Sequence, residues 1–142
     1  MLYLASDHAG FELKTEIAKF LKSRSMNFED LGNFDNNDAD YPDYARRAAK
    51  QVIKTKGKAI LFCGTGFGMS IVANRFKGIR AVVAWNPEVA ILSREHNDAN
   101  ILALPSRFVN NDEAEKIVSA FLSTTFSQED RHIKRIKQID EE

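Results

Sequence analysis

Five short apolar runs recur along this chain with helix-patterned segments between them, and this alternation limits the fold more than any other feature. The runs cover residues 2–5, 27–31, 59–62, 79–84 and 101–104. Alternation of strand and helix predicts parallel βαβ units joined by right-handed crossovers. Near-continuous apolar runs are typical of strands that are covered on both faces. We therefore expect an α/β fold, a three-layer α/β/α sandwich around a Rossmann-like, five-stranded parallel sheet.

The expected helices lie between and after these runs, where apolar residues fall at helical spacing. They cover residues 11–21, 44–54, a segment from 71 onward, 88–95, 111–122 and about 127–140. Gly57 is expected to cap the second of them. Residues 33–40 are polar and rich in Asn and Asp, which is typical of a loop.

Composition favours one domain, residues 1–142, because the chain contains no linker, repeat or low-complexity tract. Its 20 basic and 20 acidic residues cancel, which argues against nucleic acid or an acidic membrane surface as a partner. The single cysteine excludes an intrachain disulfide and a Cys-rich zinc site. With neither a signal peptide nor a membrane-length apolar run in the sequence, we expect a cytoplasmic protein.

A glycine-rich stretch, CGTGFGMS at residues 63–70, follows the third apolar run. It reads as a strand end, a turn and a helix start. Glycines let a backbone pass close to a ligand, and N–H groups at a helix start favour an anion or a thiolate. Cys63 is therefore a candidate low-pKa nucleophile or base; the alternative is a buried structural cysteine beside a tight turn.

Spacing excludes several chemistries at this stretch. A phosphate-transferring cysteine loop needs an arginine six residues after the cysteine, and that position is Met69. A P-loop needs a lysine before its Ser or Thr, and the stretch contains none. The glycine spacing also departs from the dinucleotide fingerprint, and no His and carboxylate cluster has metal-ligand spacing. What remains is a lone base near N–H donors, which suits cofactor-independent proton abstraction beside a carbonyl, with arginines to hold a phosphate.

Other polar residues also follow predicted strands. Asp7 and His8 come after the first run and Arg107 after the fifth. Ligands in parallel sheets bind beyond the carboxyl ends of the strands. We therefore expect these residues to gather with Cys63 at one edge of the sheet.

The chain resembles the ribose-5-phosphate isomerase B family, which also includes allose- and galactose-6-phosphate isomerases. The resemblance spans nearly the whole chain. It is carried, in order, by SDHAG at 6–10, DYP at 40–42, CGTGFGMS at 63–70, ANR at 73–75, GIRA at 78–81, REHNDAN at 94–100 and RHIKR at 131–135.

The resemblance implies a role for each matching residue. Cys63 would be the base that moves a proton between C1 and C2 of the sugar, with Thr65 assisting at the substrate oxygens. Asp7 and His96 would open the furanose ring, and Asn97 would contact the substrate. The remaining matches would form the anion hole (Gly64, Gly66, Gly68, Ser70), the phosphate site (His8, Arg107, Arg131, Arg135) and a pocket wall beside the sugar (Tyr41).

The resemblance also implies the assembly and the reaction. Family members are homodimers, some of them paired into tetramers, in which His96, Asn97 and Arg107 enter the site from the partner and the last helix packs across the interface. The implied reaction interconverts ribose 5-phosphate and ribulose 5-phosphate without cofactor or metal, in the pentose phosphate pathway. A hexose 6-phosphate isomerase and a non-catalytic sugar-phosphate sensor remain alternatives. Taken alone, His8 could cap a helix, His96 could satisfy a helix dipole, and Arg131 and Arg135 are ordinary solvated charges; no role follows for Trp85 or His132.

Overall fold

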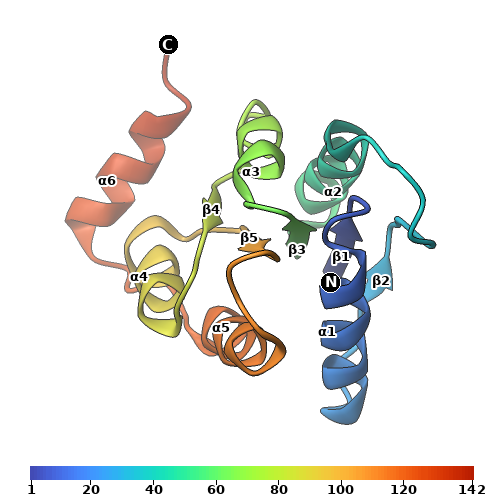
Figure 1. The fold of residues 1–142 in the computed structure, drawn as a ribbon. Helices are drawn as coiled ribbons and strands as arrows, with labels where there is room; N and C mark the ends of the chain where they lie inside the picture. The colour runs from blue at the N-terminus through green and yellow to red at the C-terminus, as the bar shows by residue number, and fades with distance from the viewer.

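The computed structural model describes residues 1–142 and contains one parallel sheet of five strands. Its strands are β1 (Leu2–Ser6), β2 (Glu29–Asp30), β3 (Lys58–Cys63), β4 (Ala81–Val83) and β5 (Ile101–Pro105), in the spatial order β2-β1-β3-β5-β4 (Figure 1). The chain moves outward from β1 to β2 and then crosses back to place β3 on the other side of β1. The order in which strands are added to the sheet therefore reverses between β1 and β3. Open α/β sheets bind ligands at such switch points.

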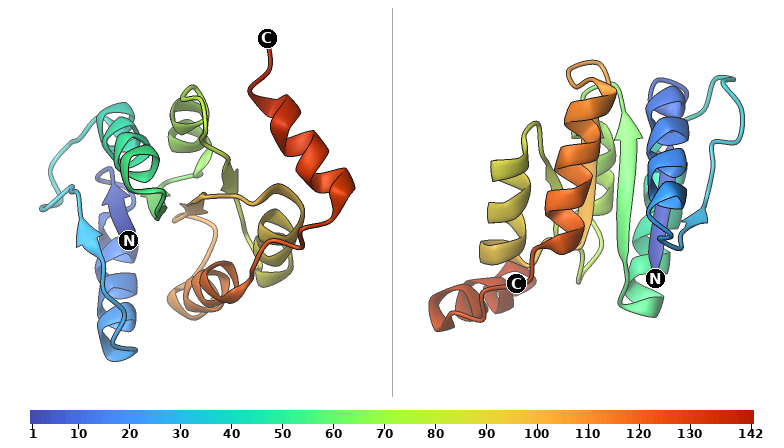
Figure 2. Two further views of the ribbon diagram at one scale, coloured as in Figure 1. Left: turned by 180° about the vertical axis from the view of Figure 1, so that it is seen from behind. Right: turned by 90° about the horizontal axis from the view of Figure 1, so that it is seen from below.

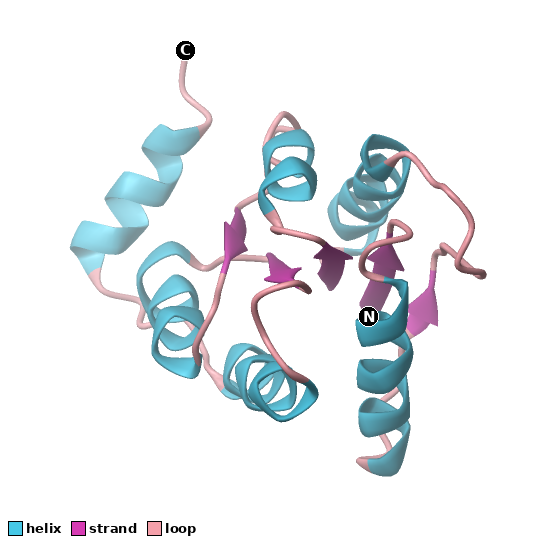
Figure 3. Cartoon of the chain, in the orientation of Figure 1, coloured by secondary structure: helices cyan, strands magenta, loops and turns pink.

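Helices cover both faces of the sheet, which gives the three-layer sandwich expected from the sequence (Figure 3). One face carries α1 (Phe11–Ser23), α4 (Pro87–Asn97) and α5 (Asn111–Ser123), and the other carries α2 (Tyr41–Thr55) and α3 (Phe67–Ala73). Successive side chains of a strand point to opposite faces of the sheet, so the strands contribute to both hydrophobic cores. Leu2 and Leu4 of β1 belong to the first core, and Tyr3 and Ala5 belong to the second. The fold class was thus predicted correctly.

The last helix, α6 (Asp130–Ile139), lies outside both layers (Figure 2). It runs beside α4, and the backbone N–H of Ser127, in the segment before it, donates to the carbonyl of Glu95 at 3.2 Å. Near its other end the Asp140 carboxylate accepts from the Gly78 N–H at 2.8 Å. Between these two ties, most of α6 faces away from its own chain.

Several element boundaries differ from those expected: β2, β4 and α6 are shorter, and the differences at α2 and α3 each have a local reason. Helix α2 begins at Tyr41, because Pro42 is tolerated in the first turn. Its left-handed capping residue is Lys56 (φ 54°), not Gly57. Position 57 has no room for a side chain, since a Cβ there would lie 2.4 Å from the Met1 carbonyl oxygen. Helix α3 begins at Phe67, directly after Gly66 in a left-handed conformation, and not at residue 71. No helix combines the length and the apolar character needed to cross a bilayer.

Candidate active site

Cys63 is the last residue of the central strand β3 and is buried, with 4% of its surface exposed. The chain turns sharply after it, and the N–H of Gly66 donates to the Cys63 sulfur at 3.1 Å. Gly66 has φ +79°, a backbone conformation that favours glycine. The glycine turn therefore places a backbone donor directly at the sulfur.

Burial raises the pKa of the Cys63 thiol, and this desolvation is the largest influence on it. The backbone N–H groups of Met69, Gly66 and Thr65 lower the pKa, and the nearby Asp7 carboxylate raises it. The balance favours the neutral thiol, so the pKa of Cys63 is shifted upward, opposite to the direction expected from the glycine loop. The loop supplies the donors that the sequence predicted, but the depth of the sulfur outweighs them.

Asp7 and His8 follow the neighbouring strand β1, at the point where the strand order reverses. Asp7 is buried, with 7% of its surface exposed, and its Oδ1 accepts from the Gly10 N–H at 2.9 Å. Gly10 allows this loop to lie on β3, since a Cβ there would be 2.1 Å from the Phe62 carbonyl oxygen. His8 is exposed, and its Nδ1 accepts from the Ala39 N–H at 3.5 Å, so its side chain does not cap α1.

Tyr41 closes one side of this region and packs on the glycine loop. A Cβ on Gly68 would lie 2.8 Å from the Tyr41 ring, so only glycine fits at that contact. A pocket of about 440 Å³ is lined by Asp7, His8 and Tyr41, together with Arg46 from the next turn of α2. Arg46 forms a 2.9 Å ion pair with Asp43 and carried no motif in the sequence.

Arg107 lies on the other side of Cys63, after β5. Its backbone N–H donates to the Gly64 carbonyl at 3.0 Å. Its guanidinium covers Gly64 so closely that a Cβ there would be 2.9 Å from Cζ. The resemblance implied that Arg107 enters from the partner subunit, whereas the structure places it against the loop of its own chain.

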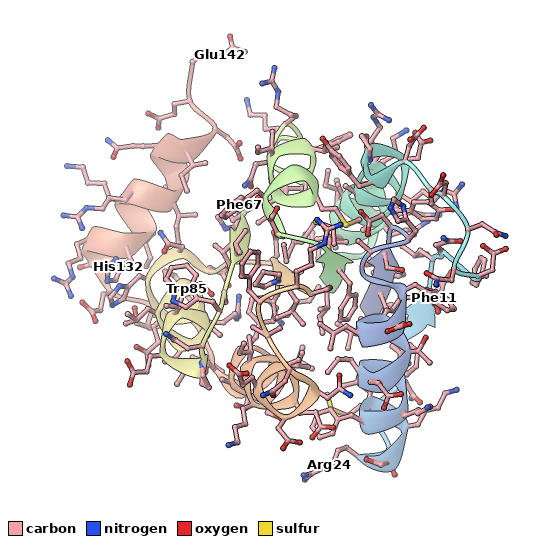
Figure 4. All side chains as sticks on the ribbon, in the orientation of Figure 1. Phe11, Arg24, Phe67, Trp85, His132 and Glu142 are labelled. Carbon is pink, nitrogen blue, oxygen red and sulfur yellow. The ribbon has the colours of Figure 1, made fainter.

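The hydroxyls of the loop make local hydrogen bonds. Thr65 Oγ1 accepts from the Phe67 N–H at 3.2 Å, and Ser70 Oγ donates to the Phe67 carbonyl at 2.9 Å. Beside Thr65, an apolar hollow of about 570 Å³ is lined by Phe67, Trp85 and Phe108. These three aromatic side chains are 60%, 56% and 71% exposed, and Figure 4 labels the first two.

The other four predicted site residues are not near Cys63 in the same chain. They are His96, Asn97, Arg131 and Arg135. Helix α4 runs back along the sheet and ends beside the first residues of β3 and β5, where Asn100 accepts from Ala59 N. A five-residue strand such as β5 separates the two edges by roughly 16 Å. The sequence-predicted site is therefore divided between opposite edges of one chain's sheet.

A network of arginines fixes the end of α4 that carries His96 and Asn97. Arg80 Nε donates to the backbone carbonyls of Asn97 and Asp98, both at 3.0 Å. The Asp98 carboxylate pairs with Arg94 at 2.7 Å and with Arg80 at 3.3 Å. Arg94 is 6% exposed and also donates to the Thr124 and Ala99 carbonyls. The GIRA and REHNDAN motifs thus meet in space and hold this turn rigid.

Three buried side-chain atoms near the predicted site residues at the two edges of the sheet lack a hydrogen-bond partner: Ser6 Oγ, Ser106 Oγ and His132 Nε2. Ser6 ends β1 and Ser106 follows β5, the two strands beside β3. His132 stacks on His96. Sequence reasoning assigned none of the three, although both serines stand directly before predicted site residues. No three His, Cys, Asp or Glu side chains converge as metal ligands.

Comparison with known proteins agrees with this architecture. Residues 2–139 match the Ribose/Galactose Isomerase family model. Ribose-5-phosphate isomerase B of Escherichia coli K12 is 45% identical over 134 residues, covering 94% of this chain and 89% of that protein. The crystal structure of a ribose 5-phosphate isomerase from Thermotoga maritima superposes with a TM-score of 0.96 at 45% identity, covering 99% and 97% of the two chains. The Mycoplasma genitalium ribose-5-phosphate isomerase B, crystallised with bound ribulose-5-phosphate, gives a TM-score of 0.91 at 42% identity, covering 97% and 92%. The chain therefore belongs to the ribose/galactose isomerase family.

Proposed function

We propose that this chain is an aldose–ketose isomerase that interconverts D-ribose 5-phosphate and D-ribulose 5-phosphate through an enediolate. The observation that carries the proposal is Cys63, buried at the end of the central strand with the Gly66 N–H at its sulfur. There a thiol meets several backbone donors at the carboxyl edge of the sheet, beside Asp7 and Arg107. The relatives with this fold and about 45% identity are ribose 5-phosphate isomerases.

In the proposed reaction the Cys63 thiolate removes the proton from C2 of the open-chain aldose. The electron pair moves into the C1–C2 bond, and the carbonyl oxygen becomes an enediolate oxygen, which the loop N–H groups stabilise. Thr65 transfers the hydroxyl proton between the two oxygens, and the Cys63 thiol returns its proton to C1. Proton transfer of this kind needs no redox partner, because the oxidation at C2 balances the reduction at C1.

The phosphate and ring-opening roles belong to the residues divided between the two edges. His8 and Arg107 stand at the Cys63 edge, and Arg131 and Arg135 would approach from a second copy. Asp7 lies on the Cys63 side, and His96 and Asn97 lie at the far edge. A homodimer that places the far edge of one copy against the Cys63 edge of the other completes the site. The exposed Phe67, Trp85 and Phe108 beside Thr65 offer such a copy an apolar contact.

The proposed cellular location is the cytoplasm, on the basis of the Cys63 thiol. A base that works as a thiolate must stay reduced, which favours the cytoplasm.

Steady-state assays with ribose 5-phosphate and allose 6-phosphate, run side by side, test the proposal. We expect ribose 5-phosphate to have the higher kcat/KM. A higher value for allose 6-phosphate would identify a hexose phosphate isomerase. Tight binding of both sugars with no turnover of either would identify a sugar-phosphate sensor and refute the enzymatic role.

A further inference from the structure

His132 is the one residue of α6 that is buried, with 6% of its surface exposed. Its ring stacks on that of His96 from α4, with the centroids 4.4 Å apart and the planes 17° from parallel. Figure 4 shows His132 near the start of α6, on the side that faces α4. The contact between α6 and its own chain is thus centred on a pair of imidazoles.

The geometry around His132 disfavours a second proton on its ring. An imidazolium carries two N–H donors, and a buried donor needs an acceptor. His132 Nε2 has no hydrogen-bond partner. The nearest carboxylate oxygen, Glu129 Oε2, is 4.0 Å away, which is too far for a hydrogen bond. Protonation would therefore leave a charged donor buried and unpaired.

The surrounding charges act in the same direction. Burial lowers the pKa of His132 most, followed by His96 across the stack and Arg131 on the same helix. Arg135, one turn further along α6, also lowers it, and only Glu129, at the start of α6, raises it. His96 is half-buried and stands at the end of α4, where a helix favours positive charge. The cation-favouring helix end thus belongs to His96, and the buried, unpaired ring nitrogen belongs to His132.

We propose that His132 is a positioning residue for His96, holding the imidazole of His96 by ring stacking and staying neutral while His96 gains and loses a proton. The proposal rests on the proposed role of His96 in opening the furanose ring. Acid–base work needs a ring that is fixed in orientation and free to exchange one proton. A neutral aromatic partner supplies the fixed orientation without adding a competing charge.

Imidazole titration tests the neutral state without reference to activity. The chain has three histidines, so carbon–proton NMR of histidine-labelled protein resolves few signals, and His8→Gln and His132→Phe assign them. We expect His132 to remain neutral at the midpoint of the His96 titration. We also expect His96 to keep its midpoint in His132→Phe. Protonation of His132 at or above the midpoint of His96 would overturn the proposal. The titration does not depend on turnover of ribose 5-phosphate. The neutral state of His132 can therefore be refuted while the proposed function holds, and the reverse is also true.

Kinetics of two variants test the positioning role. His132→Phe keeps an aromatic plate and removes the unpartnered nitrogen, so we expect kcat within a few-fold of wild type, an unchanged pH profile and no loss of thermal stability. His132→Ala removes the plate, and we expect kcat to fall by about 10- to 100-fold with a smaller change in KM. Lys137→Ala, an exposed change on the same helix, is the matched control and should leave both constants unchanged.

Two outcomes would overturn the positioning role. If His132→Phe is as poor as His132→Ala while both remain folded, the ring nitrogens of His132 are needed, and His132 contacts the substrate directly. If His132→Ala turns over like wild type, stacking contributes nothing to His96.

Discussion

The guanidinium of Arg107 lies directly over Gly64, so closely that a Cβ on Gly64 would be 2.9 Å from Arg107 Cζ and Nη1. Gly64 is not in a left-handed conformation. Its lack of a side chain therefore makes room for an arginine, and its backbone is not strained. The contact joins the glycine loop after β3 to the segment after β5, and it accounts for a glycine next to Cys63.

Gly64→Ala should therefore act through Arg107. The added methyl displaces a flexible side chain, so we expect KM for ribose 5-phosphate to rise about tenfold or more, as for a lost hydrogen bond to a charged group. Thermal stability should change little, because Arg107 is exposed. Arg107→Ala should give a similar KM, and the double variant should be no worse than either single one. Additive effects in this cycle would show that Gly64 and Arg107 act separately.

Cys63 should be essential for turnover and dispensable for binding. We expect Cys63→Ser and Cys63→Ala to lose about 10²–10⁴-fold in kcat, the usual contribution of a proton-transfer group. Calorimetric titration with ribulose 5-phosphate should show affinity within a few-fold of wild type. Near-normal turnover in either variant would remove Cys63 as the base.

The pH dependence follows from the raised pKa of Cys63. The thiolate is the active form, so kcat/KM should keep rising with pH beyond the ordinary range of a cysteine and then level off. Stability should change in the opposite sense. The unfolded thiol ionises at lower pH than the folded one, so the contribution of Cys63 to stability is complete below the unfolded pKa and is lost as pH rises through the folded pKa. Melting temperatures of wild type and Cys63→Ala should therefore converge at alkaline pH; parallel curves would contradict the shift.

Much of the fold could be predicted because the signals are local. The β1, β3 and β5 strands are continuous apolar runs, and residues at the carboxyl ends of parallel strands must meet. Asp7, Cys63 and Arg107 were placed together on that basis alone, and the structure confirms it. The pKa direction of Cys63 was wrong, because donors in a loop can be read from glycines but the depth of a side chain cannot.

The end of α4 shows what sequence alone does not give. Arg80 and Arg94 belong to sequence motifs in which neither arginine had an assigned role, and only the structure shows both on Asp98, fixing the turn that carries His96 and Asn97. The pairing of His96 with His132 was missed for the same reason: the two are far apart in the sequence, and neither has a spacing signal toward the other.

Lys14 is a buried lysine that should matter for stability. Its side chain is 2% exposed, and its ammonium donates to Asp30 Oδ1 at 2.7 Å and to the Asn33 carbonyl, at the start of the loop that leads to Tyr41. Lys14→Met keeps the length but leaves the Asn33 carbonyl without a donor and the Asp30 carboxylate without its cation, although Asp30 Oδ1 still accepts from the Gly32 N–H at 2.9 Å. Because Asp30 is one-third exposed and can rehydrate, we expect a loss of about 1–3 kcal/mol in the free energy of unfolding.

Denaturant unfolding measures that loss, with Lys19→Met as the matched control. Lys19 is on the same helix and pairs with Glu16 at 2.9 Å, but its side chain is 68% exposed. The control should therefore lose less than about 1 kcal/mol. Equal losses in the two variants would show that burial of Lys14 has no special cost.

Subunit complementation tests whether two copies share each site. Cys63→Ala and His96→Ala should each be nearly inactive. If His96 acts across a dimer, a mixed dimer contains one site with both residues intact, because one copy supplies Cys63 and the other supplies His96. Random assortment after mixed refolding makes about half of the dimers mixed, so we expect about a quarter of wild-type activity to return.

Cys63→Ala mixed with Asp7→Asn is the matched control: Asp7 and Cys63 lie at the same edge of one chain, so each site in that mixture is damaged and no activity should return. Recovery in the control, or none in the Cys63 and His96 mixture, would place His96 outside the partner's site.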